Sequence, residues 1–292
     1  VMQGVLNDEQ SETLVQAERA LAALLYDPTH CNYLRSTAEE LASVASARRA
    51  DLQDFRNLLG RGGLVLAIAG DVKTGTARAA AARAFARLGP GTPLVPTKRP
   101  NAKAPSAREK LISIRDKANV DVLVGTALPL TVRHELYHPM KVVAELLGGG
   151  VTGHLMQTIR ERDGLTYGAY AKLSGMSDGA DGYLKISATF SPARYTESVA
   201  ALRRELVVFF NRGITPKALV RVQERMIGSY LVSLSTTSNL AVFLHTIGTY
   251  GFDLDYLREY PSIINAVSHK DLVCAAELIS LDKLSLAAAG AF

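Results

Sequence analysis

The sequence has few cysteines and no long apolar run, and each absence excludes a class of protein. Its two cysteines, Cys31 and Cys274, are too few for a CxxC zinc site or a disulfide framework and form at most one bridge. No stretch of about 18 uncharged apolar residues occurs, because the longest candidates, residues 64–69 and 284–292, have only the length of a strand. We therefore expect no transmembrane segment.

Blocks of like charge are also missing. Lys and Arg total 33 and Asp and Glu total 28, and the two signs alternate along the chain. This pattern is typical of a solvated surface, so we expect no nucleic-acid partner. The 292 residues, of which 48% are hydrophobic, suffice for two domains or one large domain. The chain opens with Val1 and has no signal-peptide layout, which indicates a fragment or a processed product.

Apolar periodicity and turn residues divide the chain into helices and strands. The main expected helices cover residues 11–25, 74–88, 139–147, 192–210, 215–234 and 238–250. Strands are expected at residues 64–69, 110–115, 120–125, 166–173, 182–190 and 283–290. Residues 93–105 contain four prolines and no apolar period, which predicts an extended linker. The pattern favours an α+β fold with antiparallel sheets, each covered by helices on one face.

The stretch from His134 to His138 matches H-E-x-x-H, a pattern in which two histidines on one helix bind zinc. Pro139 follows directly and biases His138 away from the helical region, so we expect Pro139 to lie in the first turn of the next helix. No downstream residue stands in the usual position of a third ligand. We therefore interpret the stretch as a polar loop, and we expect no metal ligands in this chain.

A longer and more specific signature lies further along the chain. It begins with Leu147-Gly148-Gly149-Gly150, continues through Arg160-Glu161-Arg162-Asp163-Gly164-Leu165, and ends at Tyr167. This order resembles the C-terminal signature of the pitrilysin/insulinase family of zinc peptidases, in which one helix ends in Leu-Gly-Gly-Gly, a second ends in Arg-Glu-x-x-Gly-Leu, and a strand then begins with a tyrosine. The resemblance covers nearly the whole chain.

The resemblance implies a domain organisation. Residues 1–92 resemble the second half of one family domain, residues 93–105 its linker, and residues 106–292 a complete following domain that is inactive and contacts substrate. Zinc in this family lies on the first domain, in an inverted H-x-x-E-H motif. None of the six histidines stands in such a motif, and Gly4 occupies a position where the family often has a glutamate. The chain therefore resembles a zinc-free half, with zinc expected on a partner half.

The same resemblance suggests site residues. In the family, an arginine and a tyrosine with the spacing of Arg160 and Tyr167 come from the zinc-free domain and reach the substrate near the metal, and the glycine loop, here Gly148, Gly149 and Gly150, lies near bound peptide. A tyrosine hydroxyl can stabilise negative charge on a scissile carbonyl oxygen, and a guanidinium can hold a peptide carbonyl. The alternative is structural: Arg160 interacts with a helix C-terminus, and Tyr167 is an ordinary strand aromatic.

Two functions remain open. In the first, the chain clamps an extended peptide and contributes Arg160 and Tyr167 to a zinc site on an upstream domain or partner subunit, in a possible dimer. In the second, it is a non-catalytic structural or partner-binding paralogue. In either case we expect the chain alone to be inactive as a peptidase, because it lacks the Lewis acid that activates water.

Overall fold

The computed structural model describes residues 2–91, 102–104, 106–177 and 179–292. The chain forms two compact units. The first contains residues 1–44, 99–224 and 263–292, and the second contains residues 45–98 and 225–262. The predicted linker at residues 93–105 lies outside the described residues except for residues 102–104. The predicted domain boundaries stay a prediction.

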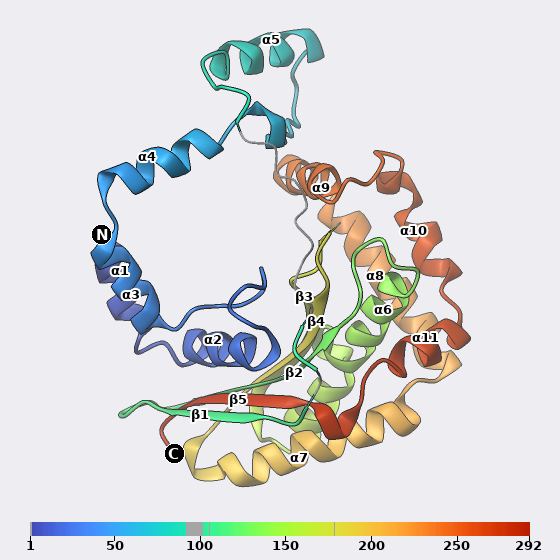
Figure 1. Ribbon diagram of the computed structural model, residues 1–292. Helices are drawn as coiled ribbons and strands as arrows, with labels where there is room; N and C mark the ends of the chain where they lie inside the picture. Colours follow the sequence, from blue (N-terminus) through green and yellow to red (C-terminus); the bar gives the residue numbers. More distant parts are fainter. Residues whose placement is uncertain (1, 92–101, 105, 178) are drawn as a thin grey trace. The chain divides into compact units, whose positions relative to one another are not determined.

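The first unit is built on one five-stranded sheet (Figure 1). Its strands in chain order are β1 (Glu109–Ser113), β2 (Val120–Leu128), β3 (Thr166–Ser174), β4 (Gly182–Phe190) and β5 (Ser285–Gly290). They lie in the order β1-β5-β2-β4-β3, so β1 and β3 are the two edges. The expected antiparallel pairing holds for β2 with β4, β2 with β5 and β3 with β4. The pair β1 and β5 is parallel, which the long connection between the two strands permits.

Helices cover both faces of this sheet. On one face, Leu21, Leu25 and Tyr26 of the α2 region (Thr13–Leu25) pack with Leu123 of β2. On the opposite face lie α6 (Tyr137–Gly148) and α7 (Tyr195–Val208), and Figure 1 shows α2 and α7 on opposite sides of the strands. The α+β class is therefore confirmed. The sequence predicted helices on one face of the sheet, and α6 and α7 cover that face. The other face is covered by α2, which comes from the start of the chain.

The remaining helices complete the two units. The first unit also holds α1 (Met2–Glu9), most of α3 (Thr37–Ser46), the π-helical turns η3 (Met156–Arg162) and η5 (Phe209–Gly213), the start of α8 (Pro216–Ser233), and α11 (His269–Ala276). The second unit holds α4 (Arg49–Leu58), α5 (Thr74–Ala84), α9 (Thr237–Thr249) and most of α10 (Tyr256–Ala266). Among the described helices, none is by itself long and apolar enough to span a membrane; α8 and α9 meet that test only as a pair bent by 113°.

The prediction of a strand at residues 64–69 is wrong. These residues form no strand, and the side chains of Leu64, Leu66 and Ile68 are 43%, 50% and 47% exposed. An apolar run becomes a strand only when a neighbouring strand satisfies its backbone N–H and C=O groups. In the described parts of the chain, no strand pairs with this run.

Candidate functional site

The glycine run ends α6 and brings it against the sheet. A Cβ atom on Gly148 would lie 2.2 Å from the backbone nitrogen of Ala171 in β3, so only glycine allows this approach. Gly149 is buried, whereas Gly150 is exposed and has φ of 63°, in the left-handed region. Of the three predicted loop residues, Gly150 is therefore the one that faces solvent.

Arg160 lies in the π-helical turn η3 rather than in the regular helix that the family resemblance implied. Leu165 N donates to Ile159 O at 2.9 Å, and Gly164, with φ of 59°, turns the chain into β3. The Arg160 side chain is 41% exposed and contacts Glu161 at 3.5 Å, an exposed pair worth little free energy. π turns are rare in proteins, and those that occur are often found at functional sites. This turn therefore marks the segment as a candidate site.

Tyr167 lies in a β-bulge. Thr166 pairs with Phe190 and Ala169 pairs with Ala188, so β3 has one more residue than β4 between these two pairs. The Thr166 hydroxyl holds the bulge by donating to Thr189 O at 2.6 Å and accepting from Gly168 N at 3.1 Å. The Tyr167 side chain is 89% exposed, an unusual position for a strand aromatic, and bulges often redirect a side chain in this way.

Beside Tyr167, on the face of the sheet that carries α2, lies a cavity of about 420 Å³. Its lining includes Leu14, Asp121, Tyr167, Tyr170, Ser187 and Thr189. The Asp121 carboxylate accepts hydrogen bonds from the hydroxyls of Thr13, at 2.6 Å, and Thr189, at 2.5 Å. The cavity is thus lined by both tyrosine rings and polar side chains, which suits a peptide segment that has both kinds of group.

The structure places Arg160 and Tyr167 on either side of one short turn, but it does not join their side chains. In the part of the chain that the structure describes, no hydrogen bond or ion pair links the two residues, and Arg160 does not line the cavity at Tyr167. Gly148 packs on β3 instead of lining that cavity. The predicted residues therefore occupy neighbouring elements and do not form one closed pocket.

An ion-pair cluster at Glu205 holds η3 against α7, and the sequence analysis did not identify it. The Glu205 side chain is 3% exposed and contacts Arg162 at 2.9 Å, Arg204 at 3.0 Å and His154 at 3.1 Å. Burial disfavours its charged form, but hydrogen bonds from Arg162 and Arg204 outweigh burial and lower the pKa of Glu205. The signal was a glutamate within the apolar stripe of Leu202, Leu206 and Phe209, where a charge requires a buried partner.

The two histidines of the H-E-x-x-H stretch lie in different elements. His134 lies in a turn before α6, and its Nδ1 accepts a hydrogen bond from Leu136 N at 3.1 Å. His138 lies inside α6, so the expectation that Pro139 keeps it out of the helix is wrong; the first turn tolerates proline because its N–H groups have no intrahelical partner. Burial, followed by Lys141, lowers the pKa of His138 to about 4. Among the described residues, no group of three or more His, Cys, Asp or Glu side chains could hold a metal ion.

Comparison with known proteins identifies a family. The model of the family described as "Peptidase M16 inactive domain" matches residues 46–226. The chain is 31% identical over 131 residues to "Uncharacterized zinc protease YmxG" of Bacillus subtilis, a match that covers 45% of this chain and 31% of that protein. It is 27% identical over 134 residues to "Non-peptidase homolog YmxG" of Helicobacter pylori, covering 45% and 30%. The chain thus spans about a third of the length of these curated relatives.

Solved structures show the same fold. The crystal structure of a peptidase M16 inactive domain from Pseudomonas fluorescens superposes with a TM-score of 0.86 at 22% identity, over 100% of this chain and 68% of that chain.

Proposed function

Because the chain belongs to the Peptidase M16 inactive domain family, we propose that it is the zinc-free half of a pitrilysin/insulinase-type metallopeptidase. In this proposal it clamps an extended peptide and contributes Arg160 and Tyr167 to a zinc site held on another domain or subunit. In this proposal the partner half supplies the zinc ligands, and no group of three or more possible ligands occurs among the described residues of this chain. The chain and its partner then form the complete enzyme, and residues 106–292 form the substrate-contacting domain.

The observation that carries this proposal is the position of Tyr167. An aromatic ring that is 89% exposed contributes almost nothing to the stability of the sheet, because it buries little apolar surface. A bulge nevertheless holds it at the start of β3 through two hydrogen bonds of Thr166. A side chain presented in this way is available to a ligand, which favours substrate contact over the alternative of an ordinary strand aromatic.

Peptide binding fits the topology of β3, which is an edge strand. An extended peptide can add to such an edge through backbone hydrogen bonds, a mode that requires little sequence preference. The cavity beside Tyr167 would then receive a peptide side chain. The exposed Gly150 is the loop residue best placed to contact peptide, while Gly148 and Gly149 keep the end of α6 in place.

The chemistry of the two side chains suits an assisting role. Peptide hydrolysis develops negative charge on the scissile carbonyl oxygen, and the Tyr167 hydroxyl can donate a hydrogen bond to that oxygen. The Arg160 guanidinium, with several N–H donors in a planar fork, can hold a neighbouring peptide carbonyl. Its exposed contact with Glu161 is weak enough to exchange for a peptide.

The second candidate is a non-catalytic structural or partner-binding role. It is favoured by the relative named "Non-peptidase homolog YmxG" of Helicobacter pylori. In that case the chain pairs with a partner but performs no chemistry, and Arg160 and Tyr167 contact the partner rather than a substrate.

The test is peptide hydrolysis by this chain mixed with its zinc-bearing half, supplied as the upstream part of the same gene or as a partner subunit. We expect Tyr167→Phe and Arg160→Gln each to lower kcat/KM by about 10- to 100-fold, the size expected for one lost transition-state hydrogen bond. Tyr33→Phe and Arg221→Gln, which alter the same residue types away from the site, serve as matched controls.

Three outcomes separate the candidates. Hydrolysis that falls in the two site variants and not in the controls supports the substrate clamp. Hydrolysis that all variants retain contradicts the assisting role of these side chains. A stable complex that binds and cleaves no peptide favours the structural role.

A further inference from the structure

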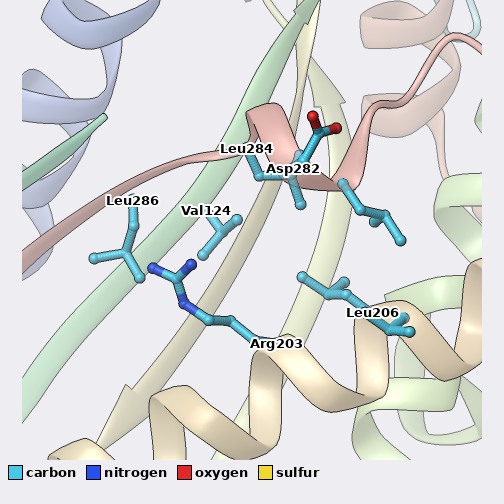
Figure 2. Close-up of a pocket in the computed structure, with 8 residues that line it drawn as sticks. Val124, Arg203, Leu206, Asp282, Leu284 and Leu286 are labelled. Atoms are coloured by element: carbon cyan, nitrogen blue, oxygen red, sulfur yellow. The ribbon is translucent and has the colours of Figure 1, made fainter. Parts of the chain in front are cut away.

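A second cavity lies on the other face of the sheet, between α7 and strands β2 and β5 (Figure 2). Its volume is about 390 Å³, at the lower end of the range for small-molecule sites. Val124 of β2, Leu286 of β5 and Leu206 of α7 form its apolar wall, and each of these side chains is at least 96% buried. The lining contains no aromatic ring, so the cavity suits an aliphatic group rather than one that stacks.

One cation marks the wall of this cavity. In Figure 2 the guanidinium of Arg203 points from α7 toward the strands that carry Val124 and Leu286, whereas the Asp282 carboxylate points away from it. Arg203 contacts Glu109 at 3.4 Å, and the two side chains are 57% and 49% exposed. An exposed pair at this distance contributes little, so a carboxylate that brings its own apolar tail can compete for the guanidinium.

We propose that this cavity binds an unbranched aliphatic carboxylate, a fatty acid of medium chain length. The tail lies against Val124, Leu206 and Leu286, and the carboxylate accepts hydrogen bonds from Arg203. Burial of each CH₂ group adds to affinity, and the fixed fork of the guanidinium selects the anionic head. Solvent reaches the site past Val207, which lines the cavity and is 47% exposed.

This site is independent of the proposed peptide site. Along β2, successive side chains point to opposite faces, so Val124 lines this cavity while Asp121 lines the one beside Tyr167. Variants in one cavity therefore leave the other intact, and the failure of one proposal leaves the other unaffected.

The experiment is calorimetric titration of the full chain with octanoate, with hexanoate and octylamine as comparison ligands. We expect one octanoate per chain, about tenfold weaker binding of hexanoate because it lacks two CH₂ groups, and no saturable binding of octylamine. Arg203→Gln should weaken octanoate by about tenfold or more, because it removes a charge-assisted hydrogen bond. Val207→Asp should also weaken octanoate binding, because it places a negative charge in the lining of the cavity.

Matched controls come from the same surface. Val208→Asp introduces the same charge one residue further along α7, at a side chain that is 42% exposed and does not line the cavity. Arg221→Gln removes an exposed cation from α8. Both controls should bind octanoate like the unaltered chain. Three results would overturn the proposal. They are the absence of saturable octanoate binding, binding of octylamine as tight as that of octanoate, and the same octanoate affinity in all four variants.

Discussion

Glu205 is a buried charge that the fold surrounds with cationic partners. Its carboxylate is 3% exposed and contacts Arg162, Arg204 and His154, and the contact with Arg162 connects η3 to α7. We predict that Glu205→Gln lowers the free energy of unfolding by about 1–2 kcal/mol, because two guanidinium groups lose a charged acceptor. Urea denaturation measures this change.

The control for Glu205 is Glu197→Gln on the same helix. Glu197 pairs with Arg194 at 3.0 Å, but the two side chains are 60% and 46% exposed. Such a pair contributes little, so stability should remain close to that of the unaltered chain. Equal effects of the two substitutions would show that burial of Glu205 does not matter.

His138 makes stability depend on pH. Its folded pKa of about 4 lies below the ordinary value of 6.5, so the unfolded chain binds a proton first as the pH falls. The contribution of neutral His138 to the free energy of unfolding is therefore fully present above about pH 6.5 and is lost progressively between about pH 6.5 and about pH 4. We predict that this residue accounts for a loss of about 1–2 kcal/mol between about pH 7 and about pH 5, after allowance for its partial contact with solvent.

The measurement is urea unfolding of His138→Gln at both pH values. Glutamine does not titrate in this range, so the variant should lose less stability on acidification than the unaltered chain. His245→Gln, which replaces an exposed histidine of α9, should keep the full loss. Burial also lowers the pKa of His154, although Glu205 partly opposes this, so a remaining loss in the same direction is expected from His154.

Among the elements, the junction of α6 and β3 tolerates little change. A Cβ atom on Gly148 would lie 2.2 Å from Ala171 N and 2.7 Å from the Tyr170 carbonyl carbon, and backbone cannot move aside as a flexible side chain can. We predict that Gly148→Ala costs about 2 kcal/mol or more, because α6 must shift from the sheet. Gly228→Ala is the control: it lies in α8 with nothing within 4 Å of its Cβ, so it should stabilise by about 0.5–1 kcal/mol. Thermal unfolding of the two variants should move in opposite directions.

The segments that the sequence predicted correctly are those that local signals define. Strand β4 was expected at residues 182–190 and is found there, because its alternating pattern and flanking turns are local signals. The π turn at Arg160 and the bulge at Tyr167 were not predicted. Each adds a residue to a regular element. The hydrogen bonds that accommodate it are donated to Ile159 O and Thr189 O, whose positions depend on packing.

At the scale of the first unit, α2 and the sheet depend on each other although about 100 residues separate them. Leu21 is 1% exposed and packs in a cluster with Leu123 of β2 and Ala287 of β5. We predict that Leu21→Ala lowers the free energy of unfolding by about 2–4 kcal/mol and speeds amide exchange in β2 and β5. Leu14→Ala, at a side chain that is 46% exposed, should have a much smaller effect. Unchanged exchange in both strands would contradict joint stabilisation of α2 and the sheet.

By itself, the sequence determined the α+β class, the order of most helices and strands, and the family signature from Leu147 to Tyr167, because these follow from local periodicity, turn residues and motif order. It also identified Arg160 and Tyr167 as candidates. Only the tertiary structure decided that residues 64–69 are not a strand, that α2 covers the second face of the sheet, and that Tyr167 projects from a bulge. These features depend on which distant segments pair and pack, and a local pattern carries no information about its partner.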